Sequence, residues 1–208
     1  TFMRLPHVTL DEAKDLVIGL VGIPWDGGTT NRPGPRHAPR QMRDQSSMVR
    51  RMHQTTHIVP YDLANIADLG DCPVNPASVD DALVRVEGYF KKLVGKGIRP
   101  LSAGGDHLCS LPVLRAVGEK KPVGMIHFDA HTDLYDSYFG GFKYTHGTPF
   151  RRAIEEGVLD PKRTIQIGLR GSMYDLDDFK YGEKMGVRLM CIEEAMELGP
   201  QKVMEIAR

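Results

Sequence analysis

Cysteine is scarce in this 208-residue sequence, where it occurs three times and never in the C-x-x-C spacing. The small, odd number excludes a disulfide framework and a zinc–thiolate site, and it indicates reduced thiols in a cytoplasmic compartment. Long apolar runs are lacking too, because no stretch reaches the roughly eighteen residues of a membrane-spanning helix. We therefore expect a cytoplasmic protein with no membrane partner.

An excess of charge of one sign is also absent. The 27 basic residues balance 27 acidic ones, which argues against nucleic acid or another polyanion as a partner. Internal repeats, low-complexity tracts and linkers are lacking as well. A chain of this length can bury a substantial core, and we interpret residues 1–208 as a single domain.

What the sequence does contain is a regular alternation of strand-like and helix-like segments. In the clearest helical segment, Ser78 offers an N-cap, apolar residues recur at helical spacing from Val79 to Val94, and Gly95 and Gly97 end the pattern. This alternation predicts an α/β fold, a mostly parallel sheet covered on both faces in a three-layer α/β/α sandwich. The expected strands are Val17–Ile23, Asn65–Leu69, Ile98–Ser102, Val123–Phe128, Thr164–Leu169 and Val187–Ile192.

The most informative segment follows the expected strand Val123–Phe128. It places Asp129, His131 and Asp133 on alternate residues. Carboxylate oxygens combined with imidazole nitrogen suit a divalent first-row metal such as manganese. In open α/β sheets, chemistry is found at the carboxyl ends of the strands, which is where these residues lie. The pattern favours a metal site over a simple helix cap or solvated loop.

Two further histidines follow the same logic. His107 comes after the strand Ile98–Ser102 and a glycine pair, and His146 lies in the segment 144–148 that follows the first cluster. Both are candidates for the same sheet edge. The buried position of His127 within its strand instead favours a hydrogen-bonded core histidine, and Cys109 is interpreted as a small buried residue. The basic run between residues 36 and 51 is interpreted as a solvated face or subunit contact.

These segments together carry a family resemblance. G-G-D-H at 104–107, D-A-H-x-D at 129–133 and H-G-T at 146–148 resemble the ureohydrolases, which include arginase, agmatinase and the guanidino-acid hydrolases. The glycine- and proline-rich loop from Ile23 to Arg36 and the segments 67–71 and 166–170 resemble other core segments of the family. The resemblance is closer to the agmatinase-like branch than to arginase proper, and it implies an arginase-like fold.

The resemblance also implies a role for each motif residue. His107, Asp129 and Asp133 would hold one manganese ion, and Asp129 and His131 a second one, with Asp129 bridging the two. Two Mn²⁺ ions are the expected cofactors, with Ni²⁺ as the alternative because imidazole also suits nickel. Asp133 would move a proton, and His146 would act as a proton-shuttling or substrate-contacting histidine.

The implied activity is hydrolysis of the guanidinium group of agmatine or a related guanidino compound to urea and an amine. Hydrolysis of guanidinobutyrate, guanidinopropionate or another guanidine compound is the alternative, as is a non-catalytic partner subunit of such an enzyme. A zinc deacylase is disfavoured because no His-His pair occurs. The family implies a homo-oligomer, a trimer or a hexamer, with a small guanidino substrate as the partner.

The sequence departs from the family pattern at two places. The family completes its metal site with a D-x-D pair on a later strand, followed by a glutamate that contacts the guanidinium. Asp175-Leu176-Asp177 has the spacing, but no apolar strand leads into it, and we interpret it as a helix start or loop. We therefore expect an amino-terminal portion that continues beyond Arg208, with the remaining ligands further on. Leu108 stands where the family more often has serine or threonine.

Overall fold

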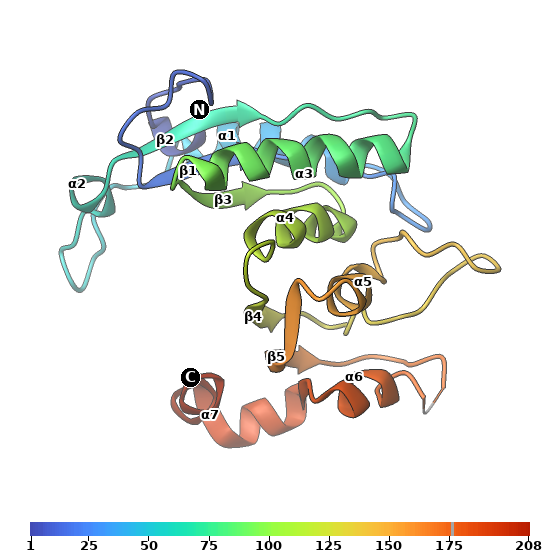
Figure 1. Ribbon diagram of the computed structural model, residues 1–208. Helices are drawn as coiled ribbons and strands as arrows, with labels where there is room; N and C mark the ends of the chain where they lie inside the picture. Colours follow the sequence, from blue (N-terminus) through green and yellow to red (C-terminus); the bar gives the residue numbers. More distant parts are fainter. Residues whose placement is uncertain (176) are drawn as a thin grey trace. The chain divides into compact units, whose positions relative to one another are not determined.

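Parallel strands alternate with helices along the chain, as the sequence predicts (Figure 1). The computed structural model describes residues 1–175 and 177–208. Within it the chain divides into two compact units, Thr1–Ala116 and Val117–Arg208, which are described separately below. The interpretation of residues 1–208 as one domain stays a prediction.

The first unit is built on a three-stranded sheet with β1 in the middle, in the order β2-β1-β3. Leu20 and Val21 of β1 are buried, as expected for a strand with a neighbour on each side and helices nearby. The strands are β1 Ile18–Gly22, β2 Ile66–Asp71 and β3 Arg99–Ala103, and the helices are η1 Phe2–Arg4, η2 Pro35–His37, α1 Ala38–Ser46, α2 Pro60–Leu63, α3 Val79–Gly95, η3 His107–Cys109 and α4 Ser110–Val117.

Helix α3 has the start and end that its sequence predicts. The Ser78 hydroxyl accepts a hydrogen bond of 3.2 Å from the backbone N–H of Asp81. Such a bond satisfies one of the N–H groups left over in the first turn. Gly97 follows the helix at a φ of 76°, a left-handed conformation that glycine adopts without a steric penalty. The apolar face of the helix is buried through Leu83, Val86, Phe90 and Leu93.

The second unit is built on the sheet β4-β5-β6. Ile165, Ile167 and Met190 of this sheet form a buried cluster with Val203 of the last helix. The strands are β4 Val123–Phe128, β5 Leu159–Leu169 and β6 Arg188–Cys191, and the helices are α5 Pro149–Glu155, α6 Lys180–Met185 and α7 Ile192–Ala207.

The observed strands confirm all six expected ones and the α/β fold class. Differences concern element ends. Strand β5 begins at Leu159, ahead of the expected Thr164. The sequence predicts a helix from Gln201 to Ala207, whereas α7 already begins at Ile192. Helix α7 is kinked at Gly199, whose φ is 73°, just before a proline, and this interruption hides its first half from a periodicity argument. Among the described residues, no helix is long and apolar enough to cross a membrane.

Candidate functional site

The backbone that follows β4 is held in place beyond the end of the strand. The N–H of Asp129 donates to the carbonyl of Ile167 at 3.2 Å, and the N–H of Arg170 donates to the carbonyl of Ala130 at 2.9 Å. Parallel hydrogen bonding to the segment containing β5 therefore extends over the first residues of the D-A-H-T-D turn. Asp129 is fixed at the carboxyl end of the sheet, as the sequence predicts.

The turn brings its first acid and its histidine together. Asp129 Oδ1 accepts a hydrogen bond of 2.9 Å from the N–H of His131 and lies 3.6 Å from His131 Nδ1. The His131 side chain is 66% exposed, so its ring is accessible to a ligand. Asp133 is buried and has a φ of 49°, a left-handed conformation that aspartate tolerates better than most residues. Its carbonyl accepts the N–H of Phe150 at 3.3 Å, which ties the turn to α5.

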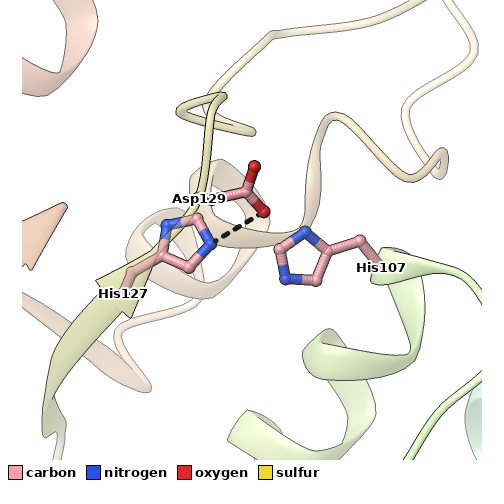
Figure 2. A group of neighbouring side chains, drawn as sticks. All are labelled: His107, His127 and Asp129. Carbon is pink, nitrogen blue, oxygen red and sulfur yellow. Dashed lines mark ion pairs between the residues drawn. The ribbon is translucent and has the colours of Figure 1, made fainter. Parts of the chain in front are cut away.

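His127 is buried beneath this turn, as the sequence predicts. Its Nδ1 lies 3.2 Å from Nε2 of Gln166, and its ring packs edge-on against Phe150 with centroids 4.6 Å apart. On its other side, Nε2 lies 3.4 Å from Asp129 Oδ2, the contact dashed in Figure 2. The interpretation of His127 as a hydrogen-bonded core histidine is confirmed.

His146 lies in a second turn of the same unit, and Thr148 holds that turn. The fully buried Thr148 hydroxyl accepts the N–H of Thr145 at 3.0 Å and donates to the carbonyl of Lys143 at 2.7 Å. The His146 ring is half-buried, with its centroid 6.1 Å from that of Tyr138. A Cβ at Gly147 would overlap the Tyr138 hydroxyl, so glycine is needed for the turn to approach this tyrosine.

His107 opens helix η3 in the first unit, where Asp106 anchors it. Asp106 is buried and accepts hydrogen bonds from the N–H of Leu108 at 2.8 Å and from the N–H of Gly28 at 2.6 Å. Burial raises the pKa of Asp106 to about 6, although these hydrogen bonds act in the opposite direction. A Cβ at Gly105 would overlap the carbonyl oxygen of Trp25. The G-G-D-H turn is therefore packed against the glycine-rich loop after β1.

That loop is itself held by a buried acid that sequence reasoning missed. Asp26 accepts the backbone N–H groups of Gly34 at 2.7 Å and Arg36 at 3.1 Å, and the Arg36 Nε at 2.6 Å. Within the basic run, Arg36 thus pairs with Asp26, and Arg43 pairs with Asp68 at 2.9 Å with only 17% of its side chain exposed. Arg40, Arg50 and Arg51 are exposed, as a solvated face predicts. The signal for Asp26 in the sequence was only its place in the loop after the first strand.

The structure places Asp129, His131 and Asp133 in one turn and His146 in another, all in the second unit. His107 belongs to the first unit, and its partnership with the acids stays a prediction. The interpretation of Asp175-Leu176-Asp177 as a helix start or loop involves residue 176, which lies outside the described residues. Of the residues in this turn, the structure brings Asp129 and His131 together, and a carboxylate beside an imidazole suits manganese or nickel.

Comparison with known proteins agrees with this reading. A model of the Arginase family matches residues 17–208. The guanidinopropionase of Pseudomonas aeruginosa is 54% identical over 208 residues, which are 100% of this chain and 65% of that protein. The mitochondrial agmatinase of Gallus gallus is 45% identical over 195 residues, which are 93% of this chain and 56% of that protein. The chain thus spans less than two thirds of the length of either relative.

Solved structures show the same fold. The proclavaminate amidinohydrolase of Streptomyces clavuligerus matches with a TM-score of 0.93 and 35% identity, over 100% of this chain and 68% of that one. A formiminoglutamase of Trypanosoma cruzi, solved with Mn²⁺, matches with a TM-score of 0.82 and 25% identity, over 95% of this chain and 68% of that one. The predicted arginase-like α/β fold is confirmed.

Proposed function

Because the chain belongs to the arginase family, we propose that it acts as a metal-dependent hydrolase that converts a small guanidino compound to urea and an amine. The observation that carries the proposal is the D-A-H-T-D turn, in which Asp129 and His131 lie together at the carboxyl end of β4. His107, Asp129, His131 and Asp133 are the proposed metal ligands.

Hydrolysis of a guanidinium group needs metal ions because the group is a delocalised cation that keeps its proton at physiological pH. It is therefore a poor electrophile. His107, Asp129, His131 and Asp133 would hold two divalent ions, which would make hydroxide available near neutral pH when bound. Mn²⁺ is the proposed ion, supported by the carboxylate-rich donors and by the Mn²⁺ in the formiminoglutamase structure. Ni²⁺ is the alternative, since imidazole suits it equally well.

The proposed hydrolysis also requires proton transfer, which we assign to residues of the second unit. The departing amine needs a proton, because an unprotonated nitrogen is a poor leaving group. The carboxylate of Asp133 is buried, so water does not compete freely for a proton placed on its oxygens. The half-buried imidazole of His146 can carry that proton onward to the amine nitrogen, since an imidazole ring can both accept and donate a proton.

We take two segments, Thr29–Arg36 and Leu134–Thr145, as candidate substrate loops, and their charges favour a substrate that ends in a carboxylate. Arg36 of the first loop is paired with Asp26 at 2.5 Å, and Asp136 of the second is paired with Arg152 at 3.1 Å and with a neighbouring arginine. These pairs leave one cation in each loop, Arg32 and Lys143, without an ion pair among the described residues, although Lys143 also acts electrostatically on Asp136. A cation at the far end of a pocket binds an acid.

We therefore favour a guanidino acid, such as guanidinopropionate or guanidinobutyrate, over agmatine. The 54% identity to a guanidinopropionase supports this choice, and the 45% identity to an agmatinase keeps agmatine as the alternative. A cytoplasmic location and a homo-oligomer, a trimer or a hexamer, complete the proposal. The free thiols of the three cysteines support a reducing compartment.

The test is urea release from the full-length protein loaded with Mn²⁺, with guanidinopropionate, guanidinobutyrate, agmatine, arginine and guanidine assayed side by side and then again with Ni²⁺. Urea from a guanidino acid supports the proposal in full. Urea from agmatine alone would overturn the charge argument. Absence of both urea and bound metal would instead indicate a non-catalytic partner subunit. Light scattering of the same preparation gives the oligomeric state.

A further inference from the structure

We propose that Gln166 is a positioning residue for the candidate metal centre, and that it acts by fixing which nitrogen of His127 carries hydrogen. Gln166 lies on β5 and is the direct cross-strand partner of His127 on β4. Its side chain is fully buried. The inference rests on one part of the proposed function, namely that the D-A-H-T-D turn binds metal.

The orientation of the Gln166 amide is determined by its other contact. Its Nε2 donates a hydrogen bond of 2.6 Å to the backbone carbonyl of Thr132. A carbonyl oxygen can only accept, so the amide nitrogen must face it. The reversed amide would set Oε1 against the carbonyl oxygen of Thr132, two acceptors at close range without a hydrogen between them.

The same amide nitrogen then determines the tautomer of His127. It faces His127 Nδ1 at 3.2 Å, and because it is a donor, Nδ1 must accept. A neutral imidazole that accepts at Nδ1 carries its hydrogen on Nε2. That hydrogen is directed toward Asp129 Oδ2, 3.4 Å away (Figure 2). Both nitrogens of His127 are therefore assigned, and neither offers a lone pair to a metal ion.

His127 thus supports the proposed bridging carboxylate and is not itself a ligand. Asp129 Oδ2 faces the His127 N–H, and Oδ1 accepts the His131 N–H at 2.9 Å. Each carboxylate oxygen has a second lone pair, which leaves one on each oxygen for a metal ion. Contacts of this kind fix the direction in which a ligand presents its lone pairs.

Gln166 also holds the far end of the turn. Its bond to Thr132 fixes the peptide that leads into Asp133, the second carboxylate of the motif. One buried amide therefore restrains Asp129 through His127 and Asp133 through Thr132.

The test combines a spectroscopic measurement with a variant. In the full-length wild-type protein, without metal, ¹⁵N NMR of the histidine rings reports the tautomer directly, with the His127 signals assigned from a His127→Gln variant. We expect an unprotonated Nδ1 and a protonated Nε2. A protonated Nδ1 would overturn the proposal, and this measurement needs neither activity nor a folded Gln166 variant.

The variant is Gln166→Met, which keeps the length of the side chain and removes its donors, with Gln41→Met on the exposed surface of α1 as the matched control. We expect Mn²⁺ affinity to fall by about tenfold to a hundredfold in the first and to stay unchanged in the second. A Gln166→Met protein that is less stable but binds Mn²⁺ as the wild type does would show a merely structural role. Wild-type protein that binds no Mn²⁺ would overturn both the positioning role and the proposed function, whereas wild-type protein that binds Mn²⁺ but releases urea from no guanidino compound would overturn the proposed function alone.

Discussion

Asp129 accepts the backbone N–H of His131 through Oδ1, and its Oδ2 lies 3.4 Å from Nε2 of His127, so each oxygen keeps a lone pair for a metal ion. Asp129→Asn keeps an acceptor for the His131 N–H and removes the negative charge. We expect the variant to fold, to lose bound Mn²⁺ and to release no urea. Metal analysis, circular dichroism and the urea assay check this. Near-normal turnover would be incompatible with a bridging role for Asp129.

His146 provides the matching experiment on proton transfer. Its turn is held by two hydrogen bonds of the Thr148 hydroxyl, so His146→Ala should leave the fold and the metal content unchanged. The rate of urea release should fall by about 10²- to 10⁴-fold, the range typical of a lost general acid or base. Loss of Mn²⁺ from this variant would instead make His146 a metal ligand.

At the scale of the element, helix α3 is stabilised at its start by one side chain. Replacing Ser78 by alanine removes the acceptor for the Asp81 N–H. We expect a loss of about 1 kcal/mol in the free energy of unfolding, measured by urea denaturation. Ser47→Ala is the control, because the Ser47 hydroxyl is exposed and donates to the carbonyl of Asp44 near the end of α1. An equal loss in both variants would contradict a specific capping effect.

The elements were largely predictable from the sequence, because apolar periodicity and caps are local signals. The start of β5 escaped prediction since Asp160, Pro161 and Lys162 lack strand character. Leu159 pairs with Val123 of β4, and these three residues lie at a register shift before the pairing resumes at Thr164. The candidate ligands of the second unit were predictable as a compact motif. Asp26 and Gln166 were not, because a single buried polar residue leaves no periodic trace. Only strand register reveals that Gln166 is opposite His127.

At the scale of the whole molecule, Asp26 links stability to pH. Burial alone would raise its pKa, but hydrogen bonds from the Arg36 side chain and from the N–H groups of Gly34 and Arg36 lower it to about 2. A carboxyl whose pKa is lower in the folded than in the unfolded state contributes stability above its unfolded value of about 4, and this is lost as the pH falls toward 2. The shift corresponds to about 2 kcal/mol.

The expected result is a wild-type free energy of unfolding that decreases between about pH 4 and pH 2. The decrease should be smaller by about 2 kcal/mol in an Asp26→Asn variant. Urea denaturation across this pH range measures both, and comparing the two proteins cancels the contributions of other acids. Parallel curves for variant and wild type would show that the contacts of Asp26 do not favour its charged form.

The close approach at Gly105 limits how the chain can vary during evolution. The two glycines of the G-G-D-H turn look equivalent in the sequence, yet a Cβ at Gly104 would lie 3.8 Å from the Cβ of Cys109, an ordinary contact, while one at Gly105 would overlap the carbonyl of Trp25. A library randomised at both positions and selected for folded protein should recover alanine at 104 and glycine alone at 105. The G-G-D-H turn lies so close to the backbone of Trp25 that selection for folded protein should exclude any residue with a side chain at position 105.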